Sequence, residues 1–265
     1  MRPPRVVAVV VLVSLLLAAC GDSDTGSADS TTTTAEEGLA GTLTVLAATS
    51  LKGAFEDVEA AFEDQHPDLD VRVTTDGSPN LATAIIEGGV PADVFASADE
   101  PNMQKVVDAD LATDGDPVIF VTNQLQIVVA EGNPLGITSL EDLTDPEISL
   151  SLCQPDVPCG SYATKAFEAA ALAVPPAGTE DKVSGVVTKV GLGEADAGLV
   201  YVTDVMAAES DVDGVDLATG EEVVAHYPAS VLTEAPNPEA AAAFVAFLTG
   251  AQAQAIFEEH GFGLP

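Results

Sequence analysis

Five short segments carry hydrogen-bond donors at points where an apolar, β-branched run gives way to helical spacing. They are Ser50, Ser78, the Pro158-Cys159-Gly160 turn, the segment around Val183, and Tyr201. The first N–H groups of a helix have no partner inside it and lie at the positive end of its dipole, so helix starts suit anions. A serine at a helix start is in most proteins a simple cap, and a tyrosine that ends a strand is usually packing. The five segments are therefore candidates for an anion site that need support from their arrangement.

Predicted strands and helices alternate along the chain. Strands are predicted at 41–50, 71–75, 92–97, 126–130, 148–152, 197–201 and 226–232. Helices are predicted at 51–62, 81–87, 101–108, 139–143, 161–172, 182–190, 203–208, 238–248 and 252–260. Pro79 suits the first turn of a helix that Ser78 caps. The alternation predicts an α/β protein with a largely parallel sheet, in which a second unit begins near residue 126.

The first 40 residues are predicted to be an export signal followed by a tether. Arg2 and Arg5 precede an apolar run at 6–17 that is too short to span a bilayer comfortably. Leu17-Ala18-Ala19-Cys20 follows and is similar to the cleavage site of bacterial lipoproteins, which implies a signal peptide at 1–20 and acylation of Cys20. Residues 21–40 are rich in Ser, Thr, Asp, Glu and Gly and predict a flexible tether. We therefore expect an exported protein that is lipid-anchored to the outer face of the cell membrane.

The formal net charge is −35, from 8 basic and 43 acidic residues. This charge makes nucleic acid and anionic membrane surfaces poor partners. It also favours an anion site built from neutral oriented donors over one built from lysines. The acidity itself is best interpreted as a solubilising surface.

Two cysteines remain after Cys20, and they lie close together at Cys153 and Cys159. A cysteine pair in an exported protein favours one disulfide, with free thiols as the alternative. The bridge would close a short loop and stiffen residues 154–158.

Several ordered motifs resemble one family, the periplasmic molybdate-binding proteins of molybdate ABC transporters. The resemblance runs from about residue 42 to 262, nearly the whole predicted mature chain. It is carried by Leu46-Ala-Ala-Thr-Ser50-Leu51, Gly77-Ser78-Pro-Asn-Leu-Ala82, Pro91-Ala-Asp-Val-Phe-Ala-Ser-Ala-Asp99, Asp156-Val-Pro-Cys-Gly-Ser-Tyr-Ala163 and Gly191-Leu-Gly-Glu-Ala-Asp-Ala-Gly-Leu-Val-Tyr201-Val-Thr-Asp204.

The resemblance implies a two-lobed, type II periplasmic-binding-protein fold with the ligand cleft between the lobes. It places lobe 1 at 41–122, lobe 2 at 123–226, and a return to lobe 1 at 227–265. The lobes would hinge near 122–127 and 224–230. The implied protein is a monomer that takes molybdate or tungstate, two ions of nearly equal size, to an ABC permease in the membrane. It implies no catalytic residue, no cofactor and no direct cation ligand.

The implied anion ligands are Ser50, Ser78, Cys159, Val183 and Tyr201. Ser50 and Ser78 would give hydroxyl and backbone N–H donors, Cys159 and Val183 backbone N–H groups, and Tyr201 its hydroxyl. The chain departs from the family at Cys159, where alanine is common, and at the proline after Ser78, where hydroxyl residues are common. A backbone donor tolerates the first change, whereas the proline removes one N–H.

Other anions and ferric iron are the alternatives within the binding class. A carrier for sulfate or phosphate would also bind its anion through oriented hydrogen-bond donors. Ferric carriers of similar fold usually present paired tyrosines, and Tyr162, Tyr201 and Tyr227 do not adjoin one another in the sequence. We therefore rank ferric iron below molybdate.

An exported hydrolase and a structural lipoprotein are the alternatives outside the binding class. His66, His226 and His260 show no metal-ligand spacing, and the chain has no Gly-x-Ser-x-Gly elbow around a nucleophile such as Ser50. A structural or adhesive lipoprotein would leave the ordered donor motifs unexplained. The sequence therefore favours a binding protein over an enzyme.

Overall fold

A computed structural model describes residues 38–88, 90–112, 117–208, 210–217 and 223–265. The predicted signal peptide, Cys20 and nearly all of the predicted tether lie outside the described residues. The tether prediction ended at residue 40, and the first strand already begins there.

The described strands form one sheet in the order β2-β1-β3-β9-β4-β7-β5-β6, with β8 paired to β4. Their bounds are β1 Ala40–Ala48, β2 Asp68–Asp76, β3 Val94–Ala96, β4 Val118–Ala130, β5 Leu150–Cys153, β6 Gly178–Glu180, β7 Ala197–Tyr201, β8 Val212–Asp216 and β9 Val224–Val231. Strand β1 is parallel to β2 and β3, and β5 is parallel to β6 and β7. Candidate donors lie at the carboxyl ends of β1 and of β7. The parallel pairing therefore determines at which edge of the sheet these donors lie.

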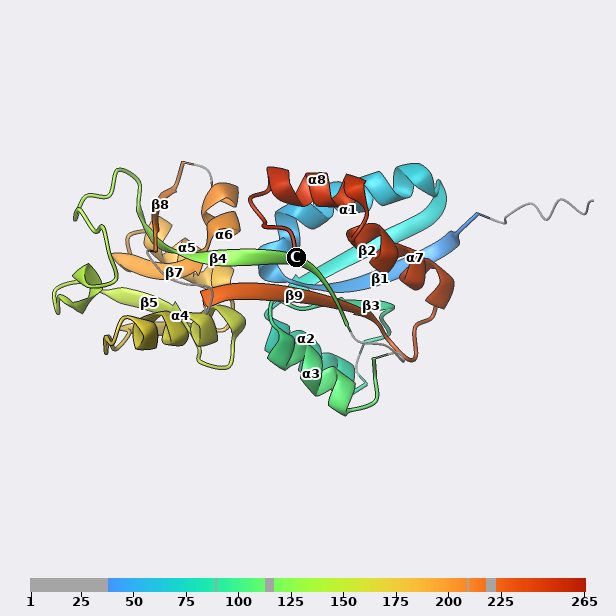
Figure 1. Cartoon of the computed structure of the whole chain (residues 1–265), viewed down its shortest axis with the longest axis horizontal. Coiled ribbons are helices and arrows are strands. Elements are labelled where there is room, and N and C mark those ends of the chain that lie inside the picture. The colour runs from blue at the N-terminus through green and yellow to red at the C-terminus, as the bar shows by residue number, and fades with distance from the viewer. Residues whose placement is uncertain (1–37, 89, 113–116, 209, 218–222) are drawn as a thin grey trace, which may run out of the picture. The chain divides into compact units, whose positions relative to one another are not determined.

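Two long strands connect the halves of the sheet (Figure 1). The first part of β4, residues 118–124, pairs with β9, whereas its last part pairs with β7 and β8. We call β1–β3 with the helices that cover them the first lobe, and β5–β8 with theirs the second lobe. The predicted boundaries at 122/123 and 226/227 fall inside β4 and β9, and they stay predictions. The α/β class and the two-lobed fold are confirmed.

Helices cover the sheet of both lobes (Figure 1). In the first lobe they are α1 Lys52–Gln65, α2 Ser78–Ile86, α3 Glu100–Asp108, α7 Pro238–Leu248 and α8 Ala251–Glu259, with the 3-10 turn η1 Thr49–Leu51 before α1. In the second lobe they are α4 Pro158–Ala169, α5 Val183–Gly191 and α6 Val202–Ala207, with the 3-10 turn η2 Asp142–Thr144.

Buried aromatic rings hold α1, α7 and α8 against the sheet. Phe55 of α1 lies 6.1 Å, centroid to centroid, from each of Phe120, Phe244 and Phe257. All four rings are fully buried, and such pairs add about 0.5–1.5 kcal/mol each beyond the burial of their area. In the described part of the chain no single helix is long and apolar enough to cross a membrane. The bent pair α7 and α8, taken together, has sufficient length and apolar composition.

Local sequence patterns predicted most elements and failed at three. Strand β7 and helix α7 match their predicted bounds, but β6 and β8 were not predicted. In β8 three of the five residues are Asp or Gly, which strands usually avoid, and pairing with β4 overrides that preference. The helix predicted at 139–143 is wrong. Three groups of Thr138 and Ser139 bind the Asp142 carboxylate and form a turn instead of a helix.

Candidate functional site

A small cavity lies between the two lobes at the ends of the strands. It encloses about 20 Å³. Its lining comes from both lobes: Ala48, Thr49, Ser50, Gly77, Ser78, Ala98, Val157, Pro158, Cys159, Lys182, Val183 and Tyr201. Pockets for drug-sized ligands enclose roughly 300–1,000 Å³, so this one suits a ligand of a few atoms.

All five residues that the sequence singled out line this one cavity. Helices α2, α4 and α5 begin there with Ser78, Pro158 and Val183, so their first N–H groups lie at its wall. Each of these helices has nine or more residues, and each turns its positive dipole end to the cavity. The structure thus brings Ser50, Ser78, Cys159, Val183 and Tyr201 together, and their role as ligands stays a prediction.

The prediction that Ser78 caps its helix is wrong. The N-cap is Gly77, and Ser78 is the first helical residue, followed by Pro79. The Ser78 Oγ instead accepts the backbone N–H of Ala98 at 3.1 Å. Because that bond uses a lone pair of the oxygen, the hydroxyl proton of Ser78 remains available to a ligand.

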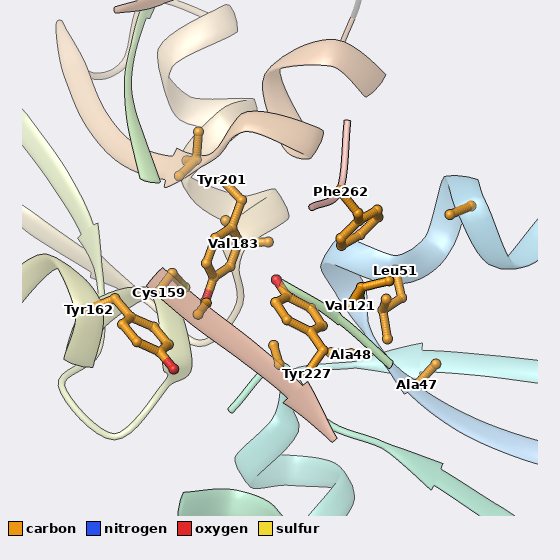
Figure 2. Packing of buried hydrophobic residues seen from close by; sticks show 14 of the residues in the cluster. Ala47, Ala48, Leu51, Val121, Cys159, Tyr162, Val183, Tyr201, Tyr227 and Phe262 are labelled. Atoms are coloured by element: carbon orange, nitrogen blue, oxygen red, sulfur yellow. The ribbon is translucent and has the colours of Figure 1, made fainter. Parts of the chain in front are cut away.

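Tyr201 brings a buried hydroxyl that has no hydrogen-bond partner among the residues that the structure describes. Its side chain is 1% exposed, and it extends beside Val183 with its hydroxyl end toward Cys159 (Figure 2). Burial raises the pKa of Tyr201 well above its ordinary value, so the phenol stays protonated. An unsatisfied buried hydroxyl costs about 1–3 kcal/mol, and an anion in the cavity would supply its acceptor.

Thr49 is a lining residue that the sequence reasoning missed. Its buried Oγ1 also has no partner in the described part of the chain, and Thr49 lies directly after β1 and before Ser50. The signal was present in the sequence, because Thr49 and Ser50 are two adjacent hydroxyl residues at the predicted junction of strand and helix.

Lys182 is the one basic residue in the described lining, and it lies where the two lobes meet. Its Nζ lies 3.4 Å from Oδ1 of Asp76 in the first lobe, which offsets its charge. Next to this ion pair, a Cβ added at Gly77 would lie 2.6 Å from the backbone oxygen of Asp181. The lobes are therefore in direct contact at the rim of the cavity. The sequence reasoning expected neutral donors alone, and Lys182 modifies that expectation.

A disulfide joins Cys153 at the end of β5 to Cys159 in the first turn of α4, with the Cα atoms 5.7 Å apart. The turn between them is tight, because a Cβ added at Gly160 would clash with the backbone oxygen of Gln154. The bridge and the glycine together fix the helix start that presents the Cys159 N–H to the cavity.

Replacing both Cys153 and Cys159 with alanine is expected to lower the free energy of unfolding by about 2 kcal/mol, because the bridge closes a short loop in the unfolded chain. Urea unfolding of the double variant and of the unchanged protein measures this difference. Equal unfolding midpoints would contradict a stabilising bridge. The single change Cys159→Ala would leave the free thiol of Cys153, so the double variant is the one to measure.

A second cavity, of about 350 Å³, adjoins the first along Thr49 and Ser50. Asp204 lines it and accepts the backbone N–H of Tyr201 at 3.0 Å. Burial raises the pKa of Asp204 from an ordinary 3.8 to about 7 in spite of that bond. The carboxyl group therefore carries a proton in the folded chain over a pH range in which the unfolded chain has released it.

This raised pKa predicts that stability falls as pH rises from about 4 to about 7, with no further contribution from Asp204 above that range. Asp204→Asn is expected to remove this part of the pH dependence, since an amide does not titrate and its oxygen can still accept from Tyr201. Urea unfolding of both proteins at the two ends of the range measures it. Parallel pH profiles would show that Asp204 does not titrate in this range.

The argument from tyrosine spacing against ferric iron does not hold in the folded chain. Tyr201 and Tyr227 are distant in sequence, yet their ring centroids lie 5.9 Å apart (Figure 2). The Tyr227 hydroxyl is, however, bonded to Ser50 and Asn123. Among the described residues no cluster of three His, Cys, Asp or Glu side chains could hold a metal ion.

The fold and the interlobe cavity define a class, the bacterial extracellular solute-binding proteins. The model of that family, described as "Bacterial extracellular solute-binding protein", matches residues 43–263, and the chain belongs to this family. One relative is the molybdate-binding protein ModA of Mycobacterium tuberculosis. It is 38% identical over 249 residues, which are 94% of this chain and 93% of the relative.

Two further similarities extend this result. A putative ABC transporter substrate-binding lipoprotein of Bacillus subtilis, YvgL, is 28% identical over 96% of each chain. The solved periplasmic molybdate-binding protein of Azotobacter vinelandii has a TM-score of 0.73 and covers 84% of this chain and 99% of its own. At 20% sequence identity, that likeness shows the fold.

Proposed function

We propose that this protein captures molybdate, or the similarly sized tungstate, outside the cell membrane and delivers it to an ABC permease. The observation that carries the proposal is the convergence of three helix starts and the unpartnered Tyr201 hydroxyl on one cavity of about 20 Å³. The 38% identity to a molybdate-binding protein over nearly the full length supports the choice of ion. The ligand needs no resident cofactor.

The donor set suits an oxyanion that stays fully deprotonated near neutral pH. Ser50, Ser78 and Tyr201 offer hydroxyl protons, and Cys159 and Val183 offer backbone N–H groups at helix starts. Each hydrogen bond to a charged acceptor contributes about 1.5–3 kcal/mol before the costs of ordering, so several together support sub-micromolar binding. Among the described lining residues only Lys182 is basic, and Asp76 offsets its charge.

Ion size provides selection against sulfate. Molybdate and tungstate have longer metal–oxygen bonds than the sulfur–oxygen bonds of sulfate. In a cavity whose walls are fixed by helix starts and by the 153–159 bridge, a smaller ion leaves some donors unsatisfied. The same argument does not separate molybdate from tungstate.

Closure of the lobes is the proposed signal to the permease. Each lobe holds part of the donor set, so the ion favours the state in which both parts meet. The hinge we propose is the paired stretch of β4 and β9, since these strands belong to both halves of the sheet. A permease that contacts both lobes would then distinguish loaded from empty protein.

Thermal unfolding with matched concentrations of molybdate, tungstate, sulfate, phosphate and ferric citrate tests the proposal. A ligand that binds only the folded state raises the unfolding midpoint. We expect a rise with molybdate and tungstate and a smaller one or none with sulfate. A rise with ferric citrate alone would favour the iron-carrier alternative, and no rise with any oxyanion would refute the proposal.

We also propose that Cys20 carries the lipid anchor, as its lipoprotein-like cleavage site and the similarity to the lipoprotein YvgL support. Cys20→Ser is expected to move the protein from the membrane fraction to the soluble fraction of the cells, because the thioether attachment needs the thiol. Fractionation followed by immunoblotting measures this. An unchanged membrane fraction would refute acylation at Cys20 as the anchor.

A further inference from the structure

Behind the cavity, four side chains form a hydrogen-bonded network that ends at Ser50. The hydroxyl oxygen of Tyr227 lies 3.0 Å from the Ser50 Oγ and 3.3 Å from the Nδ2 of Asn123. The same Nδ2 lies 2.9 Å from the Thr203 Oγ1. Asn123 and Tyr227 are 2% and 0% exposed, and neither lines the cavity. Of the four residues in this network, Ser50 is the one that lines the cavity.

The backbone fixes which end of the Asn123 amide faces Tyr227. The Oδ1 of Asn123 accepts the backbone N–H of Gln124 at 2.9 Å, so Nδ2 is turned toward Tyr227 and Thr203. An amide nitrogen carries two protons and cannot accept a hydrogen bond. Asn123 therefore donates one proton to the Tyr227 hydroxyl and the other to the Thr203 hydroxyl.

The direction of the next bond follows from the single proton of Tyr227. Its two neighbours are the Asn123 Nδ2, which cannot accept, and the Ser50 Oγ, which can. If Tyr227 accepted from both, its own buried proton would have no acceptor, which is costly, so Tyr227 donates to Ser50. Burial raises the pKa of Tyr227 well above its ordinary value, which keeps that proton on the phenol. Ser50 accepts at its oxygen, and its own proton is left for the cavity that it lines.

We propose that Asn123 and Tyr227 are positioning residues that fix Ser50 as a hydrogen-bond donor to the ligand. This inference rests on the proposed function, since it requires an oxyanion in the cavity. A site whose hydroxyl is held as a donor favours an ion with every oxygen deprotonated. An oxyanion with one protonated oxygen needs an acceptor at the wall, whereas the network holds Ser50 with its proton toward the cavity.

A double-mutant cycle between Tyr227 and Ser50 tests this role with sodium molybdate as the probe. Tyr227→Phe in the full chain is expected to weaken molybdate binding about 5- to 10-fold, because Ser50 then rotates freely and loses its fixed direction. In a Ser50→Ala background the same change is expected to alter affinity by less than about 2-fold. Equal losses in both backgrounds would show a merely structural Tyr227 and would overturn the proposal.

Asn123→Asp provides a second, nearly isosteric test. A carboxylate accepts from Tyr227, so Tyr227 would accept from Ser50 and Ser50 would present lone pairs to the cavity. Hydrogen arsenate, at mildly alkaline pH, is a tetrahedral dianion with one protonated oxygen. Since molybdate is also a dianion, the added charge of the aspartate affects both probes similarly. We expect the ratio of molybdate to hydrogen arsenate affinity to fall at least about 5-fold, and an unchanged ratio would overturn the proposal.

The two failures are distinguishable. If the unchanged protein binds neither molybdate nor tungstate, the proposed function fails. If it binds molybdate while the cycle is additive and the affinity ratio is unchanged, the function stands and the positioning role is refuted. Should Tyr227→Phe fail to fold, the affinity ratio of Asn123→Asp decides alone.

Discussion

Replacing Gly77 with alanine is expected to weaken molybdate binding about 10- to 100-fold, because the bound state requires the two lobes to meet at this residue. The added Cβ would lie 2.6 Å from the backbone oxygen of Asp181 in the second lobe, a distance at which something must move. Overpacked contacts cost about 1–3 kcal/mol, and the cost falls on the state in which the lobes touch. The cost therefore lowers ligand affinity, and a cost of this size corresponds to an affinity about 10- to 100-fold weaker.

The backbone at Gly77 makes the test specific. Its φ of −60° and ψ of 137° are open to alanine, so the substitution introduces no backbone strain. Gly38→Ala is a matched control, because a Cβ there meets no described residue within 4 Å. Isothermal titration of both variants with molybdate measures the effect. Wild-type affinity in Gly77→Ala would show that ligand binding does not require the lobes to meet at this contact.

Tyr201→Phe is expected to weaken molybdate binding roughly 10- to 100-fold without lowering the stability of the unliganded protein. The lost bond is to a charged acceptor, which contributes about 1.5–3 kcal/mol. Without an anion the hydroxyl has no partner among the described residues, so deleting it removes no bond and is expected to raise the free energy of unfolding by about 1–3 kcal/mol. Affinity and stability thus respond in different directions.

Tyr162→Phe is the matched control for that change. Tyr162 is also buried, but it does not line the cavity, and the backbone N–H of His226 partly offsets the effect of burial on the pKa of its hydroxyl. Burial raises the pKa of Tyr162 to about 12, so it too is neutral. We expect Tyr162→Phe to lower stability and leave molybdate affinity unchanged. The same pattern in Tyr201→Phe would exclude its hydroxyl from the site.

The candidate ligands could be predicted because each lies at a local feature of the sequence. Ser50, Ser78, Cys159 and Val183 lie in turns that start helices, and Tyr201 ends a strand. A parallel sheet brings such strand ends to one edge, so the local pattern also indicates where the donors meet. The family resemblance supplied the choice among several ions.

The supporting residues could not be predicted, because their contacts join distant parts of the chain. Tyr227 meets Ser50 across 177 residues and Asn123 across 104. The ion pair of Lys182 with Asp76 spans 106 residues and depends on how the lobes meet. Strand β8 was missed for a similar reason, since its acidic, glycine-containing sequence becomes a strand only by pairing with β4. All of these features depend on contacts between residues that are distant in the sequence, and a local sequence pattern does not indicate such contacts.

The most direct test of the central claim is anomalous X-ray diffraction, recorded at the molybdenum edge, from crystals of the protein grown with molybdate. Our account predicts a single strong peak inside the 20 Å³ cavity, among Ser50, Cys159 and Tyr201. A cavity without a peak, or molybdenum bound only elsewhere on the protein, would contradict it.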